Sequence, residues 1–171
     1  MKKLLTVSVL LVLSLLSFVA AKETSRMLVS VHYRFILTLG EIPMMLNASQ
    51  VKGATSGEVT VNLNGMGMNG TNMGMGMKGT NMGMGMKANR HLELIVIERR
   101  TGRRITNVMP SVTVKNAAGK VVLLNSMMPM YDVTKGRSDL HFGTNLNISN
   151  GRHTVRVSFK GETVVFKNIS P

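Results

Sequence analysis

HTVRVSFKGETVVF, residues 153–166, consists of two β-favouring runs on either side of a Lys-Gly-Glu turn. Two such runs separated by a few turn residues predict a β-hairpin. A second pair of runs, Ser111–Lys115 and Val121–Asn125, lies on either side of an Ala-Ala-Gly turn at residues 117–119. The C-terminal part of the chain is therefore predicted to be built from hairpins.

The segments before these hairpins add further strands. Met27–Leu39 contains a dense β-favouring run, Gly57–Leu63 alternates in polarity, and His91–Glu98 is a strand with a charged beginning. No segment of the sequence shows a convincing helical period with caps. Short strands joined by turns, without helices between them, predict an all-β fold, an antiparallel β-sandwich.

The first 21 residues have the build of a secretory signal peptide. Lys2 and Lys3 precede the apolar run Leu4–Val19, and small residues at 20 and 21 offer a cleavage site. This run is shorter than the roughly 20 residues of a membrane span, and no second apolar stretch approaches that length. We therefore expect residues 22–171 to form a single exported domain without a membrane span, in a periplasm or on a cell surface.

The composition restricts both the ligands and the partners. The chain has no cysteine, so disulfides and thiolate metal sites are excluded, and His, Met and carboxylates remain as candidate metal ligands. Loss of Lys2 and Lys3 would lower the formal net charge from +13 to +11. The cations are scattered and tryptophan is absent, so we expect no nucleic-acid partner, but non-specific attraction to acidic surfaces or anionic lipids.

A methionine- and glycine-rich repeat interrupts the strands. Residues 65–86, GMGMNGTNMGMGMKGTNMGMGM, hold eight of the sixteen methionines together with eight glycines. Thioether sulfur is a soft ligand that selects Cu(I), and a glycine-rich segment is costly to order. The repeat is therefore predicted to be a flexible loop that collects Cu(I), with an inert expansion as the alternative. Its auxiliary ligands would be Met66, Met68, Met73, Met75, Met77, Met82, Met84 and Met86.

Two short groups of side chains are candidates for a structured metal site. His91 and Glu93 are two residues apart on a predicted strand, so they share one face while Leu92 and Leu94 face the core. In an extended Met128-Pro-Met130, the two methionines point the same way. Simpler interpretations stay open for both groups, namely a solvated outer face and methionines that fill gaps in the core.

The order of the motifs resembles that of the periplasmic iron-transport accessory proteins. His91-Leu-Glu93, Met128-Pro-Met130, His141-Phe-Gly-Thr-Asn145 and Gly151–Val157 follow one another, and the resemblance covers about residues 85–167. It implies an immunoglobulin-like β-sandwich that binds copper or iron and works beside a membrane permease. The metal ligands that it implies are His91, Glu93, Met130 and His141. Two imidazoles and a thioether suit copper, while the carboxylate admits Fe(II) or Mn(II).

The chain departs from the family pattern in several places. The loop between Met130 and His141 is longer than usual, and the family's further C-terminal histidine has no counterpart. His153 stands where tyrosine is usual, and we interpret it as a packing residue. His32 lies outside the matched region and is not expected to be a ligand.

Two functional hypotheses follow. The first is an exported metal-binding protein for delivery, uptake or tolerance, with a permease and a second copy of the chain as candidate partners. The alternative is a cell-surface structural or interaction module of the same fold without a metal role. No nucleophile elbow, phosphate loop or paired carboxylates in a glycine-rich context occur, so we do not expect an enzyme.

Overall fold

The computed structural model describes residues 23–47, 49–61, 87–124 and 127–171. The predicted signal peptide, and the repeat at residues 65–86 with its eight candidate methionine ligands, lie outside the described residues. Within the described part, no helix is long and apolar enough to cross a membrane.

The described residues form β-strands and one short 3-10 helix, which confirms the predicted all-β fold. In chain order these elements are β1 (Thr24–Val29), β2 (Tyr33–Gly40), β3 (Met45–Leu46), β4 (Glu58–Thr60), β5 (Arg90–Glu98), β6 (Ser111–Asn116), β7 (Val121–Leu124), β8 (Met128–Asp132), the 3-10 helix η1 (Gly136–Asp139), β9 (His141–Leu146), β10 (His153–Phe159) and β11 (Glu162–Ile169).

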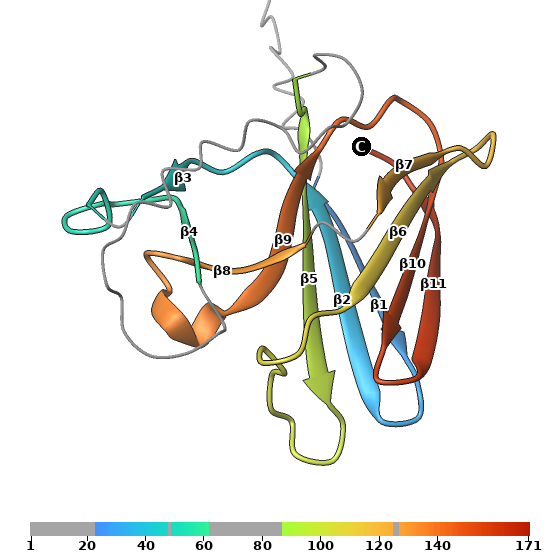
Figure 1. The fold of residues 1–171 in the computed structure, drawn as a ribbon, viewed down its shortest axis with the longest axis horizontal. Helices are drawn as coiled ribbons and strands as arrows, with labels where there is room; N and C mark the ends of the chain where they lie inside the picture. The colour runs from blue at the N-terminus through green and yellow to red at the C-terminus, as the bar shows by residue number, and fades with distance from the viewer. Residues whose placement is uncertain (1–22, 48, 62–86, 125–126) are drawn as a thin grey trace, which may run out of the picture.

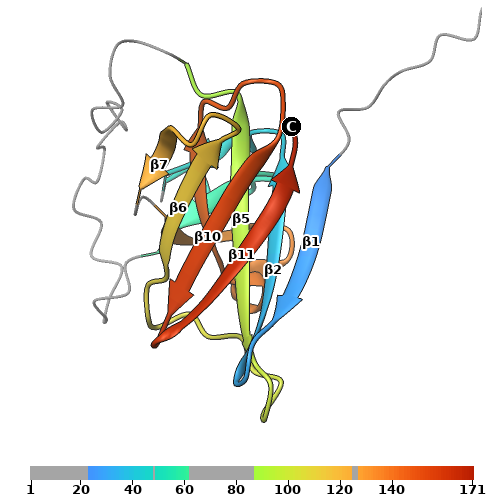
Figure 2. The ribbon, with the colours of Figure 1, turned by 90° about the vertical axis from the view of Figure 1, so that its right-hand side faces the viewer.

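The strands form two sheets that pack as a sandwich (Figures 1 and 2). The larger sheet has the order β1-β2-β5-β9-β8-β4-β3, and the smaller has the order β11-β10-β6-β7. Neighbouring strands run antiparallel except for β3 and β4, which form a short parallel pair. Figure 2 shows the smaller sheet in front of the larger one.

The main core lies between the two sheets because the strands alternate in polarity. Every second residue of β2, β5 and β10 is buried there, while the residues between them face outward. The buried side chains from these three strands are Phe35, Leu37, Leu39, Leu92, Leu94, Val96, Val155, Val157 and Phe159. A smaller cluster of Leu46, Val59 and Tyr131 joins β3, β4 and β8.

Both predicted hairpins are present. β10 and β11 meet at Lys160 and Gly161, whose φ angles of 45° and 82° are the positive values that a tight hairpin turn requires. The strand expected within Met27–Leu39 is in fact a third hairpin, β1–β2, with its turn at residues 30–32. This turn has no Gly, Pro or Asn to mark it in the sequence, and it is closed by a Ser30 N–H that donates to the Tyr33 carbonyl oxygen.

Candidate metal centre

The candidate centre lies on the outer face of the larger sheet, where β5 and β9 are neighbours. Alternation turns Leu92 and Phe142 into the core and leaves His91 of β5 and His141 of β9 on the opposite face. Both histidines are nonetheless buried, with 5% and 2% of their surface exposed. Buried histidines on the outer face of a sheet require other groups to cover them.

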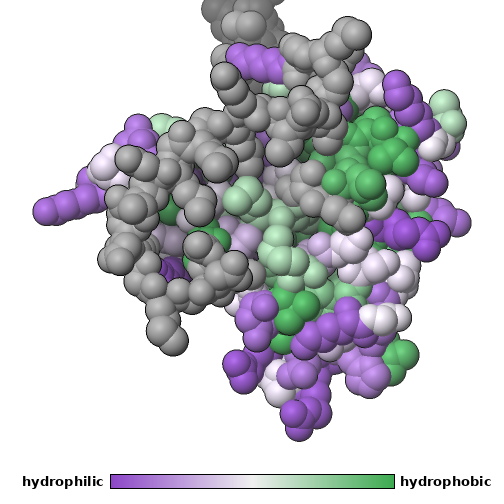
Figure 3. Space-filling view, in the orientation of Figure 1, coloured by the Kyte–Doolittle hydropathy of each residue, from purple (hydrophilic) through white to green (hydrophobic). Residues whose placement is uncertain are grey.

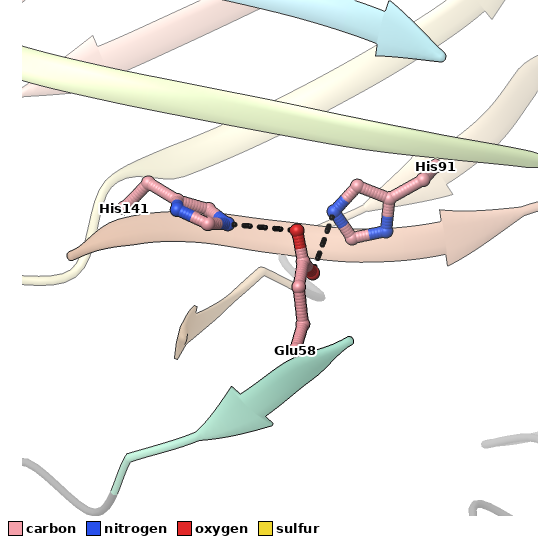
Figure 4. Close-up of side chains that lie close together, drawn as sticks. All are labelled: Glu58, His91 and His141. Atoms are coloured by element: carbon pink, nitrogen blue, oxygen red, sulfur yellow. Dashed lines mark ion pairs between the residues drawn. The ribbon is translucent and has the colours of Figure 1, made fainter. Parts of the chain in front are cut away.

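Glu58 of β4 is the group between them. Its neighbour Val59 packs into the smaller apolar cluster, so alternation turns Glu58 to the other side, towards the histidines. Gly57, just before Glu58, has no side chain because a Cβ there would lie 2.7 Å from the Met44 carbonyl oxygen. Glu58 itself is only 8% exposed, and Figure 4 shows its carboxylate reaching between the two imidazole rings.

The three side chains converge through specific atoms. Glu58 Oε1 lies 3.4 Å from His141 Nε2, and Glu58 Oε2 lies 3.4 Å from His91 Nε2 (Figure 4). The ligand atoms of the three residues are all within 4.8 Å of one another. This spacing allows one metal ion to contact all three groups.

The other ring nitrogens are held by hydrogen bonds. His141 Nδ1 lies 2.8 Å from the Asp139 carbonyl oxygen, and His91 Nδ1 lies 2.7 Å from Asn145 Oδ1. Because both partners are acceptors, each Nδ1 is the donor, and in the neutral ring the lone pair is then on Nε2. This is the orientation that outer hydrogen-bond partners give to metal-binding histidines.

Three buried atoms therefore meet without a hydrogen bond between them: Glu58 Oε2, His91 Nε2 and His141 Nε2. A buried acceptor without a donor is costly, and three acceptors at one point repel one another. A metal ion that accepts lone pairs from all three atoms relieves this arrangement. The donor set therefore fits a metal ion.

The electrostatics of the centre favour positive charge. Burial lowers the pKa of His141, but the Glu58 and Glu93 carboxylates outweigh it and the pKa lies above the usual histidine value. Burial raises the pKa of Glu93, and the nearby carboxylates of Asp139 and Glu58 raise it further. The imidazoles of His141 and His91 lower this pKa, but they do not offset the rise. Both groups therefore bind protons more readily than they would in water, and a metal ion has to compete with those protons.

Met130 provides a sulfur atom at the same place. Its side chain is 1% exposed, yet it is not among the residues of the main core. A Cβ on Gly143 would lie 2.5 Å from Met130 Sδ and 2.7 Å from His91 Nε2, so both atoms sit over the bare backbone of Gly143. Met130 also pairs directly with His141 in the β8–β9 register, so the long intervening loop does not displace the histidine.

A pocket of about 390 Å³ gives access to the centre from outside. Its lining residues are Glu23, Thr38, Gly40, Glu41, Pro43, Glu58, His91 and Glu93. Four of the eight acidic residues of this strongly basic chain therefore line one pocket. Such a concentration of carboxylates attracts cations and repels anions.

The structure brings His91, Met130 and His141 together, three of the four residues that the family resemblance implies as ligands. Glu93 lies on the pocket wall, 25% exposed, with Oε1 3.9 Å from His141 Nδ1, and is not one of the three converging residues. Glu58 was missed by the sequence analysis. In the sequence, Glu58 is one of few carboxylates and lies in an alternating strand. That pattern by itself indicates only a face exposed to solvent.

The remaining histidines lie elsewhere. His153 is 2% exposed and faces the interior from β10 in the other sheet, with Nδ1 3.2 Å from the Gly151 carbonyl oxygen. This placement agrees with a packing role. The side chain of His32 is 72% exposed and forms an ion pair of 2.6 Å with Glu162.

Comparisons with known proteins support the fold. No family model and no curated protein sequence matches the chain. Among solved structures, the chain is similar to 'as isolated' FetP of uropathogenic Escherichia coli strain F11, which was expressed recombinantly in the periplasm of E. coli. Identity is 14% and the TM-score 0.50, over 88% of this chain and 99% of that one. A copper-bound variant of FetP also matches, with 11% identity, a TM-score of 0.42 and coverage of 87% and 92%.

Proposed function

We propose that the protein is an exported metal-binding protein of the periplasmic iron-transport accessory type, with copper as its preferred ion. The observation that carries the proposal is the convergence of three buried acceptor atoms, from Glu58, His91 and His141, without a hydrogen bond between them. Met130 supplies a soft fourth donor beside His91. The acidic pocket supports entry of a cation.

The donor set determines the preferred metal. Two imidazoles and a thioether are suited to copper in both oxidation states, and thioether sulfur in particular favours Cu(I). The Glu58 carboxylate also accommodates Fe(II) or Mn(II), which prefer oxygen ligands. We propose a role in metal delivery, uptake or tolerance rather than catalysis, with a membrane permease as the candidate partner.

The function is tested on protein purified from a host supplied with copper and iron. We expect one tightly bound copper per chain, apart from ions held by the Met/Gly repeat, and a lower melting temperature after chelation. The double variant Met130→Ala/His141→Ala should weaken this site by at least about 100-fold, since loss of even one outer partner of a metal ligand costs about 10- to 100-fold. The measurement is competition with a chromophoric Cu(I) chelator.

The matched control keeps the same residue types away from the centre. Met109→Ala/His32→Ala removes an exposed methionine and an exposed histidine and should leave the affinity unchanged. Metal-free wild-type protein after purification, or unchanged affinity in Met130→Ala/His141→Ala, would favour the alternative, a structural surface module of the same fold.

We further propose that the Met/Gly repeat is an auxiliary collector of Cu(I). Deletion of residues 65–86 should reduce the number of Cu(I) ions bound per chain while the affinity of the site of Glu58, His91, Met130 and His141 stays constant. A loop of the same length with all eight methionines replaced by leucine is the control, because it separates loss of sulfur from shortening of the chain. Cu(I) capacity that is equal in all three proteins would make the repeat an inert expansion.

A further inference from the structure

One end of the sandwich gathers three loops that are far apart in the sequence. The β1–β2 turn at residues 30–32, the β5–β6 connection at residues 99–110 and the β10–β11 turn at residues 160–161 all lie at the lower end of Figure 1. Figure 2 shows the same three loops together from the side. We call this end the lower tip.

The lower tip is held together by hydrogen bonds between loops. The Arg99 backbone N–H donates to the His32 carbonyl oxygen at 2.8 Å. The Arg99 guanidinium donates to the carbonyl oxygens of Ser30 and Val31, at 3.0 and 2.8 Å. Glu162, the first residue of β11 after the third loop, accepts from the backbone N–H of His32, and its Oε1 lies 2.6 Å from His32 Nδ1. These hydrogen bonds therefore hold the three loops in one arrangement in the free protein.

Positive charge prevails on this surface. Six exposed cations belong to the three loops or to the strand residues next to them: Arg34, Arg99, Arg100, Arg103, Arg104 and Lys160. Of these, Arg104 forms an ion pair with Asp139 of η1. The carboxylates of the same described segments are Glu98 and Glu162, and they are engaged by Thr101 and His32. Figure 3 shows mainly hydrophilic surface at this end, with apolar side chains among it.

An apolar side chain stands among these cations. Val31 is 72% exposed, more than any other large apolar residue that the structure describes, and Val29 beside it is 50% exposed. The Val31 carbonyl oxygen accepts the Arg99 hydrogen bond, so the residue is held in position instead of collapsing onto the core. Val31 and Val29 therefore place apolar surface next to the cations, and burying it against an apolar partner would be favourable.

We propose that the lower tip docks onto a bilayer that contains anionic phospholipids. The arginines and Lys160 would contact the headgroups, while Val31 and Val29 enter the boundary with the acyl chains. A soluble polyanion would neutralise the cations, but it would provide no apolar surface against which the two valines could be buried. Because His91 lies seven residues from Glu98 along β5, docking would hold the metal centre roughly 20 Å from the surface.

This proposal is independent of the metal function and is tested with lipid vesicles. The exported, processed protein is sedimented with vesicles of phosphatidylglycerol and phosphatidylcholine, and with phosphatidylcholine alone. We expect binding only to the anionic vesicles, weakened by salt. Arg100→Ser/Arg103→Ser should lower the partition coefficient about 25-fold, because each basic residue near such a surface contributes on the order of fivefold.

Two further variants make the test decisive. Lys115→Ser/Lys120→Ser changes the net charge equally at the β6–β7 end of the molecule and should have little effect. Val31→Ser should weaken vesicle binding several-fold at constant charge and leave binding to soluble polyphosphate unchanged. Equal losses in the two double variants would show that net charge alone acts. An unaffected Val31→Ser variant would indicate a soluble polyanion as the partner, and either result would overturn the proposal.

Discussion

Gly143→Ala is expected to abolish tight copper binding while the sandwich stays folded. The added Cβ would lie 2.5 Å from Met130 Sδ and 2.7 Å from His91 Nε2, well inside contact distance. The flexible methionine can turn away, but its sulfur then leaves the centre, and His91 can yield only by straining its hydrogen bond to Asn145. Overpacking of this kind costs about 1–3 kcal/mol, which a domain of this size can tolerate.

The affinity of this variant is measured by competition with a Cu(I) chelator, and its fold by circular dichroism and melting temperature. We expect a loss of about 100-fold or more, comparable to loss of two ligands. Gly40→Ala is the matched control, because Gly40 also lies in a strand and lines the same pocket, but its added Cβ comes no closer than 3.7 Å to Glu23. Equal affinity in the two alanine variants would show that Met130 and His91 do not bind the metal over Gly143.

A second large effect is expected on the choice of metal. Glu58→Gln keeps the shape of the side chain but removes the hard, charged donor, so binding of Mn(II) or Fe(II) should fall by about 10- to 100-fold. Cu(I) should be affected much less, because Met130, His91 and His141 remain. The Glu58 carboxylate also raises the pKa of His141. Without this carboxylate, protons compete less strongly with the metal ion for the His141 imidazole.

Met130→Leu should have the opposite effect. Leucine fills a similar volume without sulfur, so Cu(I) affinity should fall while Mn(II) affinity stays close to that of the wild type. The measurement is the ratio of the Cu(I) and Mn(II) dissociation constants in each protein. If Glu58→Gln and Met130→Leu lowered both affinities equally, the two residues would affect folding of the centre and not the selection of metal.

The strands were predictable because their signal is local. Alternation in β5 and the turn between β10 and β11 are properties of adjacent residues, and both predictions are confirmed. The β1–β2 turn was not found, since Ser30, Val31 and His32 carry no strong turn signal. The parallel pairing of β3 with β4 is likewise absent from the pattern, because it depends on contacts between separate segments.

The site was predictable only where motifs carried it. His91, Met130 and His141 lie on strands whose alternation and order are visible in the sequence, and the structure places them together. Glu58 lies before the Met/Gly repeat and reaches the centre through the pairing of β4 with β8. Its neighbours in the sequence give no sign of this, because a glutamate in an alternating strand has the same pattern whether its partner is water or two imidazoles.

The short strand β4 gives metal binding a mechanical consequence. β4 has three residues and pairs with β8 and β3 at the far side of the larger sheet from β1, whereas Glu58 contacts β5 and β9. An ion shared by these groups would cross-link segments distant in the chain, much as a disulfide does in secreted proteins that contain one. At a free concentration 100 times the dissociation constant, this linkage would stabilise the folded state by about 2.7 kcal/mol. Supply of the ion would thereby regulate resistance to unfolding and proteolysis.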